Sequence, residues 1–484
     1  MTSSPTTSRH LAGQQKQAWM AIQGLGFFLA LPLLVRAGRF LIPIFPLGSF
    51  AVGVFLYLRA PVLYVGFTWW MWFLGPLIRR IIDYQSGYLT PGPWLLTPLL
   101  VTFISVMTLV KHLPNTSRQG GLPFIMCFGA VFYAFCTGVI QNSVTGCVLN
   151  LLAWLTPLLF GFHLFVNWRD YPEYRQVIQS TFLWGTLVMG AYGIWQYLVA
   201  PEWERFFLRE ITATSFGKPE PLGIRVFSSL DSPQTFAAVM MAGIVLLWTN
   251  PKILRNLSAG VGHLSFLLSM ARSLWLSWIL GMLIFVPSLK ARFQMRLVVS
   301  VMVASLFIVP LVSIEPFSTV IGDRLESLSN TKKDTSANDR AEGYSELIGL
   351  AITEFVGRGL GSNVESDSLG SKDSGILSML FSLGWFGSIP YLTGMFLLFF
   401  KLFQDSKVSS DPFVSAARAI ALTTFAQIGL NVPMISAFGM VLWGFIGIGM
   451  SAHKYYLYQQ TTQRERGYTN VVSLPDRKLQ TLNK

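Results

Sequence analysis

Long apolar runs separated by short polar segments dominate the sequence. Runs such as 144–166 and 376–400 are continuous, and each is long enough to cross the hydrocarbon core of a membrane as a helix. A transmembrane barrel would instead alternate apolar and polar residues over segments of about ten. The pattern therefore predicts an all-α fold, a polytopic transmembrane helical bundle of roughly 12–14 spans.

Composition supports this fold class. Hydrophobic residues make up 52% of the 484 residues and charged residues 12%, whereas a soluble domain carries about a quarter charged residues. The net charge of +13 arises from basic residues in short loops and in the C-terminal segment, as the positive-inside bias requires. We therefore expect membrane lipids as partners and no nucleic acid. Cys127, Cys136 and Cys147 are interpreted as small core residues.

Basic residues also orient the chain. The segment from His453 contains Lys454, Arg464 and Arg466, so it is expected in the cytoplasm. Successive spans cross the membrane in opposite directions, so counting the spans backward from this segment places residues 314–375 outside. The same count does not orient the two apolar runs within 19–58, which Arg36 and Arg39 interrupt. The predicted parts are a cytoplasmic N-terminal tail (1–18), N-terminal transmembrane helices (19–200), an extracytoplasmic loop with Arg225 (201–233), transmembrane helices with a turn at Arg272 (234–313), a large extracytoplasmic catalytic loop (314–375), C-terminal transmembrane helices (376–452) and a cytoplasmic tail (453–484).

The large loop is the longest polar stretch in the chain. Residues 316–373 carry ten acidic and six basic side chains between apolar runs. Membrane proteins place function disproportionately in such loops. Its Arg324 and Arg340, together with Arg225 and Arg272, are candidates for an anion-binding site that faces away from the cytoplasm.

Two of these arginines have informative surroundings. Arg272 lies in the apolar run SFLLSMARSLW, and an ionisable group at membrane depth is costly and suggests function; a snorkelling arginine is the structural alternative. Its planar guanidinium suits a phosphate. Arg225 opens the sequence RVFSSLDSP immediately before a span. The serines and the aspartate there can cap that helix, whose N-terminus favours an anion, although a capped helix with a loop arginine would look the same.

Apolar residues in the large loop recur at helical spacing. Tyr344, Leu347, Ile348, Ala351, Ile352 and Phe355 follow steps of three and four. This spacing predicts an amphipathic helix on the outer membrane surface or on the spans. The glycines that follow, Gly357, Gly359 and Gly361, indicate a helix stop and a tight turn. Arg340 precedes the helix, where the dipole disfavours a cation unless an anion is near; a salt bridge to Asp339 or Glu342 is the alternative.

Asp373 stands where the chain re-enters the membrane, in the sequence KDSG. A carboxylate partly desolvated there could act as a general base, or simply cap the following helix. The five histidines are scattered without metal-ligand spacing, so we expect no metal and no cofactor.

Read together, these positions resemble the bacterial O-antigen ligase/polymerase superfamily, integral membrane glycosyltransferases, from about residue 225 to residue 390. The similarity rests on the order of five pieces relative to the spans: RVFSSLDSP (225–233), LSMARS (268–273), Ser336 to Arg340, GRGLGSN (357–363), and Asp373 with Gly384 eleven positions later. The N-terminal half is similar in hydropathy alone.

The resemblance implies the reaction and the roles. Two undecaprenyl-diphosphate-linked glycans, donor and acceptor, are joined on the outer face of the bacterial cytoplasmic (inner) membrane, with no metal and no nucleotide sugar. Arg225, Arg272 and Arg324 would bind the diphosphate, Arg340 would be a further clamp, and Asp373 would be the base or would orient the acceptor. Ligases that load lipid A core typically have His where Asp373 stands, so aspartate favours O-antigen or exopolysaccharide polymerisation. A chain-length regulator and a flippase remain open as partner proteins.

Three alternatives stay open. The first is a ligase that moves glycan to a lipid or protein acceptor, and Asp373 is the one feature of the sequence that separates this interpretation from a polymerase. A transporter of lipid-linked saccharide would want broken or charged helices in paired positions near the midplane, whereas the polar residues here gather at the outer boundary. A purely structural membrane protein would have no need of Arg272.

Overall fold

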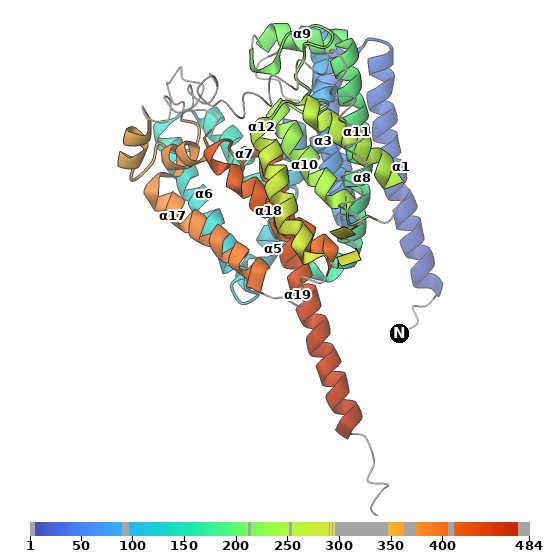
Figure 1. The fold of residues 1–484 in the computed structure, drawn as a ribbon, viewed down its shortest axis with the longest axis vertical. Helices are drawn as coiled ribbons and strands as arrows, with labels where there is room; N and C mark the ends of the chain where they lie inside the picture. Colours follow the sequence, from blue (N-terminus) through green and yellow to red (C-terminus); the bar gives the residue numbers. More distant parts are fainter. Residues whose placement is uncertain are drawn as a thin grey trace, which may run out of the picture.

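The computed structural model describes residues 5–89, 96–211, 214–250, 254–289, 291–292, 294–295, 347–362, 374–404 and 411–472. These residues form helices and no β-strand, with one isolated bridge between Gly217 and Ile224. The all-α fold predicted from the apolar pattern is therefore confirmed for this part of the chain. Figure 1 shows the helices gathered into one bundle, with the C-terminal part of the last helix projecting from it.

The elements follow the apolar runs closely. In chain order they are α1 (Pro5–Leu34), η1 (Gly38–Phe40), α2 (Leu41–Arg59), α3 (Pro61–Ser86), α4 (Thr97–Phe103), α5 (Val106–Thr116), α6 (Leu122–Gln141), α7 (Val144–Val166), η3 (Trp168–Asp170), α8 (Tyr171–Val199), α9 (Glu202–Ile211), η4 (Thr214–Phe216), α10 (Pro233–Leu247), α11 (Leu254–Leu268), α12 (Arg272–Phe285), η5 (Val286–Ser288), a helical stretch at 347–353, α17 (Gly375–Gln404), α18 (Pro412–Ala426), η8 (Gln427–Gly429) and α19 (Ser436–Val472).

Nine helices among the described residues are long and apolar enough to cross a membrane, so the chain is a multi-pass membrane protein. The sequence predicts roughly 12–14 spans. Part of the difference comes from α10, α11, α12 and α18, which have only 14 or 15 residues and cover about 22 Å of a core about 30 Å thick. The sequence also predicts a span at 302–312, which lies outside the described residues.

Some predicted boundaries differ from the helices. α1 begins at Pro5 and so includes most of the predicted polar tail 1–18, while α19 continues to Val472, well into the predicted tail 453–484. The predicted loop 201–233 contains α9 and η4. Cys136 is exposed, whereas Cys127 and Cys147 are buried; the prediction of a core position was wrong for Cys136, because its helix turns that face away from its neighbours.

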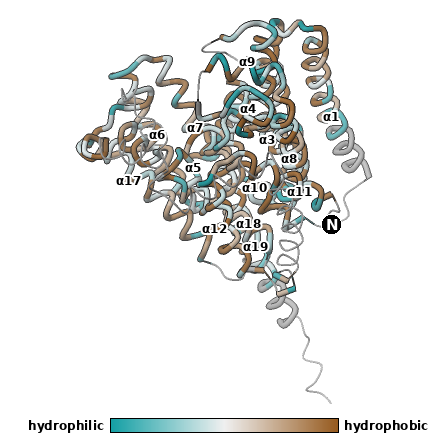
Figure 2. Tube along the Cα trace, turned by 45° about the horizontal axis from the view of Figure 1, so that its top comes forward, coloured by the Kyte–Doolittle hydropathy of each residue, from teal (hydrophilic) through white to brown (hydrophobic). Residues whose placement is uncertain are grey.

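Aromatic side chains fill the centre of the bundle. The ring of Trp69 on α3 lies 4.9 Å from that of Phe182 on α8 and 5.7 Å from that of Phe160 on α7, measured between centroids. Trp69, Trp154 and Trp443 are almost fully buried. Apolar residues cover the helices along their lengths, and hydrophilic residues gather around α9 (Figure 2). The bundle therefore has a packed interior and an apolar outer surface suited to lipid.

The two ends of the bundle are distinct. α9 lies at one end, and the projecting part of α19 leaves from the other, the end near which the N-terminus also lies (Figure 1). The sequence predicts that the α19 extension is cytoplasmic and that the α9 loop is outside. The arrangement is consistent with that orientation, which remains a prediction.

A break inside α17 is paired with a loop segment. Gly384 has φ +60° and ψ −173°, which interrupts the helix. The amides of Trp385 and Phe386 donate to the carbonyls of Glu354 and Phe355, at 3.3 and 3.2 Å. We call residues 354–361 the strap. Since a broken helix leaves backbone groups without partners, the strap satisfies groups that the break exposes.

The strap is held on its other side by α6. The amide of Leu360 donates to the carbonyl of Ala134 at 2.9 Å, and the side-chain amide of Asn142 donates to the carbonyl of Arg358 at 2.7 Å. The predicted helix before it is present at 347–353, and it buries Leu347 and Ala351 against α17. The predicted helix stop at the glycines is also confirmed, because Gly357, Gly359 and Gly361 all have φ between +74° and +83°.

Gly384 and Gly357 lie where the strap packs tightly against the helix, because a Cβ on either residue would meet the backbone of the other. A Cβ on Gly384 would collide with the backbone of Val356 and Gly357. Gly384 and Gly357 also both have positive φ. We predict that Gly384→Ala lowers the free energy of unfolding by about 2 kcal/mol or more, measured by thermal unfolding in detergent. Gly349→Ala is the matched control, because nothing lies within 4 Å of its Cβ position. Equal stability of both variants would contradict this description of the break.

Candidate functional site

The structure brings together two of the five predicted site residues. Arg225 and Arg272 are 47 positions apart in sequence, yet both lie at the turn between α11 and α12. Arg324, Arg340 and Asp373 lie outside the described residues.

Arg225 connects the segment before α10 to that turn by hydrogen bonds. Its guanidinium donates to the carbonyls of Ser269 and Met270, both at 3.3 Å, and to the carbonyl of Ser215 at 2.8 Å. Ser269 and Met270 follow the last residue of α11, where helix carbonyls lack partners within the helix. A cation is also favourable at a helix C-terminus. Arg225 thus has a structural role that the sequence did not reveal, in addition to its position beside Arg272.

Arg272 is the first residue of α12 and is half-buried. A helix N-terminus carries exposed N–H groups and a positive partial charge. A guanidinium at this position is disfavoured by the dipole, whereas an anion is favoured. Met270, two residues earlier, has φ +53°, a conformation that non-glycine residues rarely adopt and that often marks a functional site. The turn is therefore a strained, cationic helix start.

The segment RVFSSLDSP is also fixed by hydrogen bonds to its surroundings. The side-chain oxygen of Gln196 accepts from the amides of Phe227 and Ser228, at 3.2 and 2.8 Å. Ser228 is buried with φ +51°, a second strained residue near the arginines. The predicted cap is present at Ser232, whose hydroxyl accepts from the amide of Thr235 at 3.1 Å. α10 therefore begins at a fixed position relative to Arg225.

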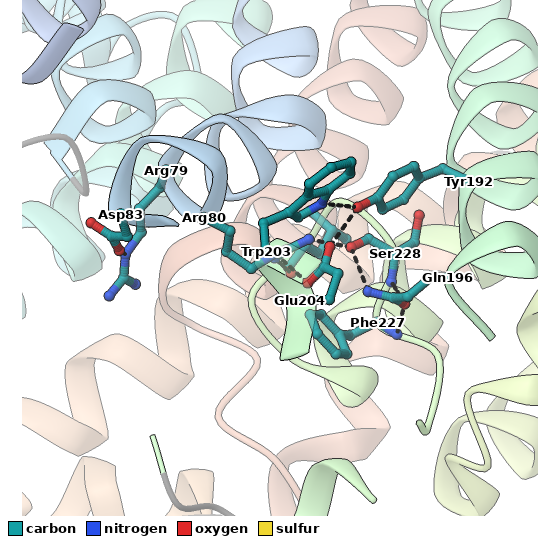
Figure 3. A network of polar contacts seen from close by, with 10 residues as sticks. Arg79, Arg80, Asp83, Tyr192, Gln196, Trp203, Glu204, Phe227 and Ser228 are labelled. Carbon is teal, nitrogen blue, oxygen red and sulfur yellow. Dashed lines mark hydrogen bonds and ion pairs between the residues drawn. The ribbon is translucent and has the colours of Figure 1, made fainter. Parts of the chain in front are cut away.

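A buried ion pair lies beside this segment (Figure 3). The guanidinium of Arg80, near the end of α3, is 2.8 Å from the carboxylate of Glu204 on α9, and the two side chains are 1% and 0% exposed. Arg80 also donates to the carbonyls of Ser228 and Leu230. One arginine therefore joins α3, α9 and the segment that carries Arg225.

Aromatic groups enclose the pair. The Arg80 guanidinium lies over the ring of Phe227, 4.8 Å from its centroid. The hydroxyl of Tyr192 donates to Glu204 and accepts from the indole of Trp203 at 2.9 Å. Burial raises the pKa of the Glu204 carboxyl, and the Arg80 guanidinium acts in the opposite direction. A charge in such surroundings needs its partner, since an uncompensated buried ion is very costly.

Sequence reasoning missed Arg80, Glu204 and Gln196. From the sequence, the apolar run that begins at Pro61 is predicted to be a span that ends at residue 78, directly before Arg79 and Arg80. α3 instead continues to Ser86, and its charged residues are paired within the protein. An ionisable residue at the edge of a span is the signal that could have indicated Arg80. Its partner Glu204 is 124 positions away, which no local pattern predicts.

The described residues contain no group of three or more His, Cys, Asp and Glu that could hold a metal. The same residues form a cationic N-terminus on α12, and the buried network around Arg80 and Glu204 supports the segment that contacts it. Such a helix start is suited to bind an anionic group of a substrate. No protein-family model matches the chain, and no curated protein sequence matches it either.

Glu204→Gln tests the buried pair. The change leaves Arg80 without its counter-charge in a desolvated position, so we predict a loss of about 3 kcal/mol or more in the free energy of unfolding. Glu202→Gln is the matched control on the same helix. Glu202 is 64% exposed and pairs with Arg205 at 3.3 Å, so its loss should cost less than about 1 kcal/mol. Thermal unfolding in detergent measures both, and a smaller loss for Glu204→Gln than for Glu202→Gln would refute the role of the pair.

Proposed function

We propose that this protein is a membrane glycosyltransferase that polymerises undecaprenyl-diphosphate-linked oligosaccharide repeat units into O-antigen or exopolysaccharide. The observation that carries the proposal is the convergence of Arg225 and Arg272 on one helix start, at the α9 end of a multi-pass bundle. The resemblance of the pieces between residues 225 and 390 to the O-antigen ligase/polymerase superfamily supports it.

The proposed reaction needs cations more than it needs a nucleophile on the protein. A hydroxyl of the acceptor sugar attacks the anomeric carbon of the donor and forms the new glycosidic bond. The bond between that carbon and the diphosphate oxygen breaks, and undecaprenyl diphosphate leaves with the bonding electrons. Preorganised donors placed where this charge develops lower the barrier. Arg272 and the first amides of α12 are suited to that task, because they combine charge with exposed N–H groups.

The remaining roles are carried over from the resemblance. Asp373 takes the proton of the acceptor hydroxyl or orients that hydroxyl, Arg324 binds the diphosphate, and Arg340 is a further clamp. Aspartate at position 373, in place of the histidine typical of lipid A core ligases, favours polymerisation. The α9 end would then face the outside of the bacterial cytoplasmic membrane.

Arg225 and Arg272 have different expected effects when changed. Arg225 donates to two backbone carbonyls of the turn and to the carbonyl of Ser215 in η4, so Arg225→Ala should lower both stability and activity. Arg272 begins α12 and would contact the diphosphate directly, so Arg272→Ala should lower diphosphate binding and polymer formation.

We predict that Arg272→Ala lowers polymer formation by about 100-fold or more, because a charge-stabilising group is lost. The measurement is the chain length of surface polysaccharide in a strain that lacks the wild-type gene and expresses each variant at equal membrane abundance. Arg209→Ala is the matched control, an exposed arginine on α9 at the same end. Single repeat units without long chains are expected for Arg272→Ala and normal chains for Arg209→Ala.

Other results would contradict the proposal. Normal polymer length with Arg272→Ala would refute the site. Lipid-linked units trapped inside the cell would select a transporter. Long chains that form but fail to reach a lipid or protein acceptor would select a ligase.

A further inference from the structure

A buried pair of side-chain amides lies between the start of α12 and the start of α17. Gln427, the first residue of η8, is 5% exposed, and Asn431 is 9% exposed. The side-chain amide of Asn431 donates to the side-chain oxygen of Gln427 at 2.8 Å. Buried amides of this kind persist where every donor and acceptor finds a partner.

Gln427 connects this pair to the arginine turn. Its side-chain nitrogen donates to the carbonyl of Ser273 at 3.1 Å and to the hydroxyl of Ser277. Ser273 is the residue after Arg272 and belongs to the first turn of α12. The position of Gln427 is therefore coupled to the backbone that carries Arg272.

Asn431 connects the pair to α17. Its backbone carbonyl accepts from the amide of Gly375 at 3.0 Å. Gly375 permits this approach, since a Cβ there would lie 2.8 Å from the same carbonyl. Buried Ser374 caps the helix by accepting from the amide of Leu377 at 3.2 Å. The start of α17 is thus fixed at the residue that follows Asp373 in sequence.

We propose that Gln427 and Asn431 form an amide bridge that fixes the start of α12 relative to the start of α17. The bridge would thereby keep the diphosphate-binding part and the acceptor-binding part of the active site aligned. The inference rests on the proposed function, which assigns the diphosphate to Arg272 and the acceptor to Asp373. The bridge runs from Ser273 through Gln427 and Asn431 to Gly375. Gln427 is a positioning residue, because it acts through the two helix starts and not on the substrate.

The chemistry of the bridge requires an amide at position 427. One end of the side chain must donate to Ser273 and Ser277, and the other must accept from Asn431. Methionine has a similar length but cannot donate, and its sulfur accepts only weakly. An ionised glutamate can accept but cannot donate, whereas a protonated glutamate can do both. Alignment matters because a misplacement of about 1 Å can cost about 100-fold in rate.

The test uses the full-length protein in lipid vesicles with an undecaprenyl-diphosphate-linked repeat unit. For Gln427→Met we expect polymerisation to slow by about 10-fold to 100-fold, while the affinity for undecaprenyl diphosphate changes by less than about 3-fold, since Arg272 is retained. For Gln427→Glu we expect the rate relative to wild type to rise as the pH falls, because protonation restores the donor. Gln427→Met should show no such rise.

Gln179→Met is the matched control. The side-chain nitrogen of Gln179 donates to the carbonyl and the hydroxyl of Thr249, at 3.2 and 3.0 Å, at the far end of α10 from Ser232. This change should leave polymerisation within about 2-fold of wild type, since it removes a comparable amide bridge away from the site.

The outcomes separate the two proposals. A wild-type protein that makes no polymer in this assay would refute the proposed function and the bridge with it. An active wild type with a fully active Gln427→Met, or a parallel loss of undecaprenyl diphosphate affinity and turnover, would refute the bridge alone. If Gln427→Met does not fold, Gln427→Glu decides, and a rate relative to wild type that does not depend on pH would overturn the inference.

Discussion

The hydrogen bonds from Arg225 to the carbonyls that end α11 are the interaction on which the rest of the site depends. They hold a loop arginine against a turn far away in sequence, and this turn begins the helix that carries Arg272. Together with the hydrogen bond from the amide of Val226 to the carbonyl of Leu268, they join the segment before α10 to the turn before α12. Arg225, Arg272 and the N-terminus of α12 therefore lie at the same turn. The arrangement makes sense of the strained backbone at Ser228 and Met270, because strain persists only where the surroundings enforce it.

Satisfaction of buried polar groups is the second theme of the structure. In a chain this apolar, an unpaired charge or backbone group is costly, and two such groups have specific partners far away in sequence. Arg80 is paired with Glu204 and with backbone carbonyls. The break in α17 is paired with the strap. These pairings are distant in sequence, so they stabilise the arrangement of helices and do not merely cap their ends.

The sequence predicted individual helices well and their partners poorly. α7 matches its predicted bounds of 144–166, and the break around residues 271–273 is present, because hydropathy and helix-breaking residues are local signals. The extension of α3 beyond residue 78 was missed, because the partner that makes burial of Arg80 possible lies 124 positions away on α9. The contact between Arg225 and the α11–α12 turn was missed for the same reason. The roles of Arg324, Arg340 and Asp373 stay predictions.

Binding of undecaprenyl diphosphate to the purified protein tests the central claim most directly. The measurement compares the affinity for undecaprenyl diphosphate with that for undecaprenol, which has the same tail and no charge, in wild type and in Arg272→Ala. We predict that the wild type prefers the diphosphate by about 100-fold or more and that the variant loses most of this preference. Equal affinity of the wild type for both lipids, or an unchanged preference in the variant, would contradict the account.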